Sequence, residues 1–233
     1  MKNISYDIKI ENQPNDTTCG PTCLHSIFTF LKKPIPLKKT IAEVRYLDNG
    51  GTMGEALGIY ALENDLKVTI YTHNLSVFDP TWFKIGKAKL IKKLKKQIRA
   101  PKTLKIKKSS KLYIDFLKLG GKVKFEPLTS EFLSQLLEVK GPVIVGLSST
   151  YLYMSPRERN DDNEYDDVYG SPQGHFVVLG GINEDRTKVE VYDPLDENPI
   201  SKSNNYKIDT TQFINSILIG AITYDANIIV IEE

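Results

Sequence analysis

A cysteine stands where a polar loop meets the start of a predicted helix, in the segment QPNDTTCGPTCL. The first turn of a helix has unpaired backbone N–H groups, and together with the helix dipole they favour an anion. Cys19 at this position is therefore favoured as a thiolate, the reactive form of the side chain. Pro21 suits a first turn, and Gly20 would let a substrate approach the backbone. These features make Cys19 a candidate nucleophile.

A thiolate that attacks a carbonyl creates an oxyanion, which needs hydrogen-bond donors. The backbone N–H of Cys19 is one candidate, and the side-chain amide of Gln13, six residues earlier on the loop, is another. A lone cysteine is more often a small buried hydrophobic residue. The glutamine, the polar loop and the helix start together favour the chemical role over that alternative.

His175 opens the apolar run HFVVLGG and is a candidate general base. The chain then passes Gly180-Gly181 and a turn at residues 183–187, a pattern that predicts a hairpin. Such a hairpin would return Asp193 beside His175, where a carboxylate fixes the tautomer and orientation of an imidazole. Taken singly, a histidine that starts a core strand is more often structural, and Asp193-Pro194 is only a turn signal.

The elements that must position these residues change character along the chain. Helices are expected at residues 19–31, 37–46 and 52–62, the last with the capping-box spacing of Thr52 and Glu55, after a short strand at 8–10. Strand-like runs follow at 143–147, 176–179, 188–192 and 227–231, with a helix at 211–218. Helices first and strands later predict an α+β fold, with an N-terminal helical half packed on a C-terminal antiparallel sheet.

The segments QPNDTTCGPTCL and GHFVVLGGINEDRTKVEVYDP resemble the signature regions of papain-like cysteine peptidases. They are most similar to the bacteriocin-processing double-glycine peptidase family (family thirty-nine of the cysteine peptidases) and its soluble relatives, and the glycines around Gly50 to Gly54 extend the likeness. The resemblance implies a papain-like fold. It also implies an oxyanion role for Gln13, the nucleophile role for Cys19, the base role for His175 and the orienting role for Asp193.

The bulk properties predict one catalytic domain over residues 1–233 in a reducing, cytoplasmic setting. No stretch approaches the roughly 20 apolar residues of a membrane span, and the start, MKNISYDIKI, lacks the apolar region of a signal peptide. The only other cysteine, Cys23, is expected to pack in the core, because a structural metal site needs about four ligands. His25 and His73 carry no motif and are expected to be surface or core residues.

The net charge of +2 is unevenly distributed. All thirteen charged residues from Lys84 to Lys111 are cationic, which leaves −11 for the rest of the chain. We predict a basic helical insertion at residues 84–121, docked by a narrow apolar seam and open to an acidic partner; nucleic acid is disfavoured, and a solvated helix face is the commoner alternative. The seam residues are Leu90, Ile91, Leu94 and Ile98. The acidic segment from Ser149 to Gly174 is predicted to be a loop or lid.

The sequence therefore predicts a cysteine peptidase or isopeptidase that hydrolyses a peptide or protein substrate through an acyl-enzyme on Cys19. Neither a cofactor nor a metal is expected. Two alternatives stay open at this point. One is an acyl or peptidyl transferase that passes the same thioester to a different acceptor. The other is a catalytically silent peptide-binding module.

Overall fold

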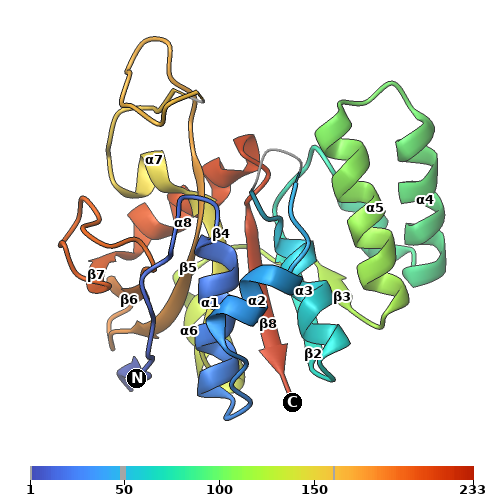
Figure 1. Ribbon diagram of the computed structural model, residues 1–233. Helices are drawn as coiled ribbons and strands as arrows, with labels where there is room; N and C mark the ends of the chain where they lie inside the picture. The colour runs from blue at the N-terminus through green and yellow to red at the C-terminus, as the bar shows by residue number, and fades with distance from the viewer. Residues whose placement is uncertain (1, 48–50, 160) are drawn as a thin grey trace.

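The computed structural model describes residues 2–47, 51–159 and 161–233, so Gly50 lies outside the described residues. Eight strands form one sheet, in the order β3-β2-β8-β4-β5-β6-β7, with β1 paired to β5 (Figure 1). The strands are β1 (Ile4–Ser5), β2 (Lys67–Thr72), β3 (Lys122–Lys124), β4 (Val143–Ser148), β5 (Gly174–Ile182), β6 (Lys188–Tyr192), β7 (Asn205–Asp209) and β8 (Asn227–Glu232).

Helices cover both faces of this sheet (Figure 1). The α-helices are α1 (Cys19–Phe30), α2 (Leu37–Glu43), α3 (Gly54–Glu63), α4 (Lys87–Arg99), α5 (Leu104–Lys118), α6 (Ser130–Lys140), α7 (Ser149–Leu152) and α8 (Thr210–Ile219). Two 3-10 helices, η1 (Pro80–Lys84) and η2 (Gly220–Ile222), complete the description. The predicted α+β class is confirmed.

The central strands are buried on both faces, and alternate residues enter different cores. In β5, Phe176 and Val178 join the core shared with α1, α3 and α5, whereas Val177 and Leu179 join the core shared with α6 and α8. The apolar run after His175 is therefore continuous rather than alternating, because each of its residues finds a hydrophobic layer. This double burial fixes β5, the strand that carries His175, at the centre of the molecule.

The sheet draws on both halves of the chain. β2 and β3 are parallel to each other, and the other neighbouring strands of the sheet are antiparallel. β1, β2 and β3 come from the first 124 residues, so the sheet is not built from the C-terminal half alone. The strand predicted at residues 8–10 is wrong, since the first strand is β1, and β7 was not predicted.

The basic stretch divides into two different helices. α4 lies at the edge of the molecule against α5 (Figure 1), with Leu90 and Leu94 buried and its lysines exposed. α5 belongs to the core, where Tyr113 and Phe116 are almost fully buried. Lys105, in the first turn of α5, reaches the face of the molecule that carries Cys19. The insertion boundaries 84–121 remain a prediction, but the two helices have different environments.

Candidate active site

Cys19 is the first residue of α1, and its side chain is 8% exposed. The helix start is held by Thr22, whose hydroxyl donates to the carbonyl of Thr18 at 2.8 Å. Close packing requires a glycine at position 20, because a Cβ there would lie 2.5 Å from Thr52 Oγ1 and 3.2 Å from Phe176 Cδ2. A side chain at this position would push apart α1, β5 and the segment before α3, so glycine permits the approach that seats Cys19 over β5.

The structure brings His175 and Asp193 together from adjacent strands, as the hairpin prediction required. β5 pairs antiparallel with β6, with Val178 opposite Tyr192, and Asp193 directly follows β6. His175 Nε2 lies 2.8 Å from Asp193 Oδ1, and both side chains are buried. Burial opposes protonation of the imidazole, but the charge of Asp193, the Cys19 thiolate and hydrogen bonds to both outweigh it and raise the pKa of His175 to about 10.

The carboxylate of Asp193 is surrounded by donors. Its Oδ2 accepts hydrogen bonds from the hydroxyls of Tyr153 and Tyr206, each at 2.8 Å. Its Oδ1 accepts from the backbone N–H of Leu195 at 2.9 Å in addition to the imidazole. Burial alone would raise the pKa of Asp193, but the neighbouring charge and hydrogen bonds of His175 and these donors hold it below its ordinary value. An ionised, fully bonded carboxylate is suited to hold His175 in one orientation.

Gln13 is joined to the residue after Asp193 through its backbone. Its backbone N–H donates to Pro194 O at 2.8 Å, which ties the loop before α1 to the residue after Asp193. The side-chain Nε2 donates to Asn15 O at 3.1 Å, while the buried Oε1 has no hydrogen-bond partner among the described residues. The Nε2 group has a second hydrogen beyond the one given to Asn15, and the oxyanion role of Gln13 stays a prediction.

The remaining cysteine and histidines have structural contacts. Cys23 is fully buried, and its thiol donates a hydrogen bond to Phe176 O, with a sulfur–oxygen distance of 3.2 Å. Burial, followed by the charges of Cys19 and Asp193, raises the pKa of this thiol well above its ordinary value. His25 contacts Ile35 O and Glu11, and His73 contacts Glu126 O. These contacts agree with the prediction that Cys23 packs in the core and that His25 and His73 are surface or core residues.

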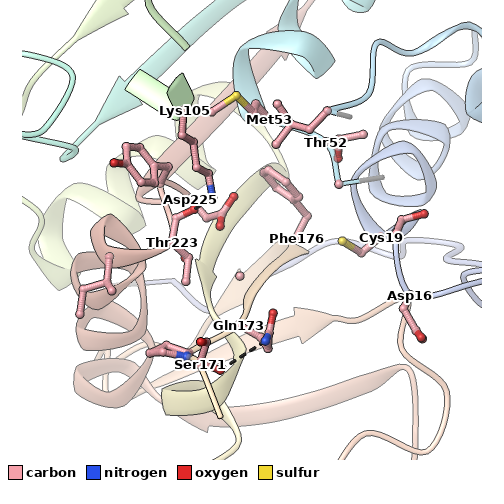
Figure 2. Close-up of a pocket in the computed structure, with 17 residues that line it drawn as sticks. Asp16, Cys19, Thr52, Met53, Lys105, Ser171, Gln173, Phe176, Thr223 and Asp225 are labelled. Carbon is pink, nitrogen blue, oxygen red and sulfur yellow. Dashed lines mark hydrogen bonds between the residues drawn. The ribbon is translucent and has the colours of Figure 1, made fainter. Parts of the chain in front are cut away.

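Beside Cys19 lies a cavity of about 350 Å³, between the helical half and the sheet (Figure 2). Its wall includes Thr52 and Phe176 on the Cys19 side, and Lys105 and Asp225 on the far side. The capping box predicted from Thr52 and Glu55 is wrong, because α3 begins after Met53 without a side-chain cap. Thr52 Oγ1 is instead buried without a hydrogen-bond partner in the described part of the chain. Neither Lys105 nor Asp225 stood out in the sequence, since no motif surrounds them.

The predicted lid begins with α7 and continues as a long loop above the body of the molecule (Figure 1). Asn163 on this loop donates to Asp16 Oδ2 at 3.0 Å, which links it to the loop before Cys19. Burial, followed by the negative charge of Asp16, raises the pKa of Glu158. Acidic side chains therefore lie around the approach to the cavity.

In residues 2–47, 51–159 and 161–233, no helix is both long and apolar enough to cross a membrane. The same ranges contain no group of three or more histidine, cysteine and acidic side chains arranged to hold a metal ion.

The comparisons with known proteins address the family. The model of the Peptidase C39 like family matches residues 5–218, which span both candidate signature segments. The chain belongs to this family. Among solved structures, the chain is similar to a double glycine motif protease from an AMS/PCAT transporter in complex with the leader peptide. The two share 12% sequence identity, with 100% of this chain and 98% of that chain covered and a TM-score of 0.46. No curated protein matches.

Proposed function

We propose that this C39-like chain is a cysteine peptidase or isopeptidase, with Cys19 as nucleophile, His175 as base and Asp193 as the residue that orients the histidine. The observation that carries the proposal is the buried His175–Asp193 pair at 2.8 Å, beside a cysteine at a helix start. Membership of a peptidase family supports the same reaction class. A peptide would lie in the cavity that Cys19 borders.

In this proposal the proton of the Cys19 thiol passes to His175, and the thiolate attacks the carbonyl carbon of the substrate. The C–N bond then breaks as the imidazolium gives its proton to the departing amine, which leaves a thioester on Cys19. His175 next takes a proton from water, whose oxygen attacks the thioester and releases the carboxylic acid and the thiol. The backbone N–H of Cys19 and the side-chain amide of Gln13 would stabilise the oxyanion.

Two alternatives follow from the same geometry. A transferase would pass the acyl group from Cys19 to an amine other than water, and the acidic loop is a surface that such an acceptor could contact. A silent binding module would keep the cavity without turnover. The retained cysteine, histidine and aspartate, with a fully hydrogen-bonded carboxylate, favour catalysis.

We further propose that the basic exposed face of α4 binds an acidic partner outside the catalytic cleft, and that the protein acts in the cytoplasm. The face combines lysines with a short buried seam, so its charge is available to a partner.

Incubation of the protein and a Cys19→Ser variant with a defined peptide library tests the proposed function. New peptide termini, identified by mass spectrometry, should appear with the unmodified chain and not with the variant. Added amines such as glycinamide separate hydrolysis from transfer, because a transferase yields amide products. Equal cleavage by both proteins would overturn the assignment of Cys19, and peptide binding without any cleavage would support the silent module.

A further inference from the structure

The cavity beside Cys19 has a charged far wall. Figure 2 shows Cys19 and Asp225 on opposite sides of the cavity, with Phe176 between them and Lys105 next to Asp225. Asp225 lies in the turn between η2 and β8, where its backbone N–H donates to Gly220 O at 2.9 Å. A Cβ on Gly174 would lie 1.8 Å from Asp225 Oδ2, so the carboxylate packs directly against the residue before His175. The fold thus holds this carboxylate close to the candidate catalytic centre.

Lys105, the cation on this wall, already makes contacts within the protein. Lys105 Nζ donates to Thr223 O at 2.9 Å and lies 4.8 Å from the centre of the Tyr224 ring. Within the described parts of the chain, Lys105 forms no ion pair with Asp225 at salt-bridge distance. Its charge therefore compensates Asp225 only from a distance.

A second carboxylate lies behind the first. Glu55 on α3 is 1% exposed and accepts a hydrogen bond from Ser109 Oγ at 2.6 Å. Burial raises the pKa of Asp225 to about 7, although Lys105, Thr223 and His175 all act to lower it. Burial, with a further contribution from the charge of Asp225, also raises the pKa of Glu55 to about 7. Lys105 and His175 supply the positive charge that acts on Asp225, and together with the Thr223 hydrogen bond they do not outweigh the effect of burial, so the negative charge of this wall is under-compensated.

Thr52 stands at the opposite end of the cavity, beside Cys19 (Figure 2). Thr52, which lines the cavity next to Cys19, is 8% exposed, and its Oγ1 has no partner in the described part of the chain. That oxygen is itself buried and lies against α1, 2.5 Å from where a Cβ on Gly20 would stand, so it packs inside the protein. The feature of the cavity that can select a ligand is therefore the Asp225 carboxylate at its far end (Figure 2).

We propose that Asp225 is a specificity residue, which selects substrates that place a lysine or arginine side chain in the cavity beside Cys19. This inference rests on the proposed function, because it identifies the substrate class of the same site. The cationic group would pair with the carboxylate of Asp225. Asp16 on the cavity rim and the acidic loop add negative charge at the entrance and favour the same class of peptide.

Three methanethiosulfonates that differ mainly in charge test this inference at Cys19 itself. They carry a 2-aminoethyl, a methyl or a 2-sulfonatoethyl group, and mass spectrometry follows their rates at Cys19. At pH 8 the cationic reagent should react faster than the anionic one. Asp225→Asn should lower the cation-to-anion rate ratio about 3–10-fold, the size expected for one charge at this range in a partly screened site. Lys105→Gln should raise the ratio.

Matched controls isolate the role of the cavity carboxylate. Asp185→Asn, in the turn at the other end of β5, removes the same charge far from the cavity and should leave the ratio unchanged. Between pH 6 and 8 the ratio should rise in the unmodified chain as Asp225 ionises, with Lys105, His175, Glu55 and Asp16 as the other charged groups facing it. The rise should be smaller in Asp225→Asn.

A peptide arm tests side-chain selection directly. Tripeptide vinyl sulfones carry lysine or its uncharged analogue norleucine at one position at a time. At one position the lysine probe should label Cys19 faster, and Asp225→Asn should remove that preference. Equal labelling by both probes at every position, or a charge ratio that Asp225→Asn leaves unchanged, would overturn the inference. A slow reaction with the neutral methyl reagent would count against the proposed function instead, and the charge ratio would still be measurable.

Discussion

Two aspartates flank the strand that carries His175, and their surroundings differ sharply. Asp193 is fully buried, accepts bonds from two tyrosine hydroxyls and one backbone N–H, and has a lowered pKa. Asp225 lines the cavity and has no salt bridge; Lys105, Thr223 and His175 do not outweigh its burial, which raises its pKa to about 7. A carboxylate whose bonding capacity is filled can fix a neighbour, whereas one left under-compensated is available to a ligand.

The largest expected difference between the two aspartates is their effect on the charge of His175. In Asp193→Asn the adjacent anion is lost while burial still opposes protonation, so the pKa of His175 should fall by several units from about 10. In Asp225→Asn the pKa of His175 should change by less than one unit. The chain has three histidines, so NMR of protein labelled with ¹⁵N at histidine resolves the titration of this ring.

The loss of the Asp193 charge should also change the hydrolysis rate. Because the imidazolium protonates the leaving amine, hydrolysis should decline as pH rises through the pKa of His175, and this decline should move to lower pH in Asp193→Asn. At pH 8 its hydrolysis rate should fall by about 10³–10⁴-fold, as for an orienting carboxylate in a triad. Equal effects of the two substitutions on the ring titration would break the comparison.

The donors to Asp193 should contribute to folding stability. Tyr206→Phe removes one hydrogen bond to the ionised carboxylate and should lower the free energy of unfolding by about 1.5–3 kcal/mol, measured by urea denaturation at pH 7. Tyr151→Phe is a matched control, because the Tyr151 hydroxyl only accepts a long bond of 3.5 Å from Asn215. It should cost less than about 0.5 kcal/mol. A smaller loss for Tyr206→Phe than for the control would mean that Asp193 does not depend on this donor.

Ionisation of Glu55, on the Asp225 side of the site, should lower the folding stability as pH rises. The pKa of Glu55 is about 7 in the folded state, above the ordinary 4.5, so burial of its ionised form costs stability as pH rises from about 4.5 through 7. Glu55→Gln removes that cost. The free energy of unfolding of Glu55→Gln minus that of the unmodified chain should therefore increase by about 1–3 kcal/mol from pH 5 to pH 8. If the difference in free energy of unfolding between the two chains stays constant over this pH range, the raised pKa assigned to Glu55 is contradicted.

The smallest effect is expected where charge is abundant but distant from the cavity. Replacement of the α4 lysines Lys92, Lys93, Lys95 and Lys96 by Gln should change the alkylation rate of Cys19 by less than about 2-fold, because solvent and salt screen these exposed charges. The single substitution Lys105→Gln on α5 should alter the charge preference of the same thiol more than all four. Loss of Cys19 reactivity in the fourfold variant, with an unchanged circular dichroism spectrum, would place α4 in the catalytic half.

The local signals in the sequence were sufficient for the centre of the candidate site. The helix start at Cys19 and the hairpin from His175 to Asp193 depend on residues close together in the chain, and the structure has both. The short strand at 8–10 was mistaken because β1 is only two residues long and is defined by its partner β5. β7 was missed because its alternating residues, NYKID, become visible as a strand only beside β6.

The cavity wall could not be read from the sequence, because its members meet only in three dimensions. Lys105 appeared as one of thirteen cations, and Asp225 lay in a turn without a motif. Thr52 matched a capping box, but its hydroxyl does not cap α3 and is buried against Gly20 of α1. The two tyrosines that bond Asp193 come from α7's end and from β7, 40 and 13 residues away in the chain. Contacts at such separations depend on how the sheet packs rather than on local spacing.

The central claim is that Cys19 is the nucleophile, and limited alkylation tests it most directly. The protein is treated with a small amount of iodoacetamide near neutral pH, and the labelled cysteine is identified by mass spectrometry. Cys19 should be labelled first, and much more slowly in His175→Ala, while the buried Cys23 should react only on unfolding. Labelling of Cys23 before Cys19 in the folded protein would contradict the claim.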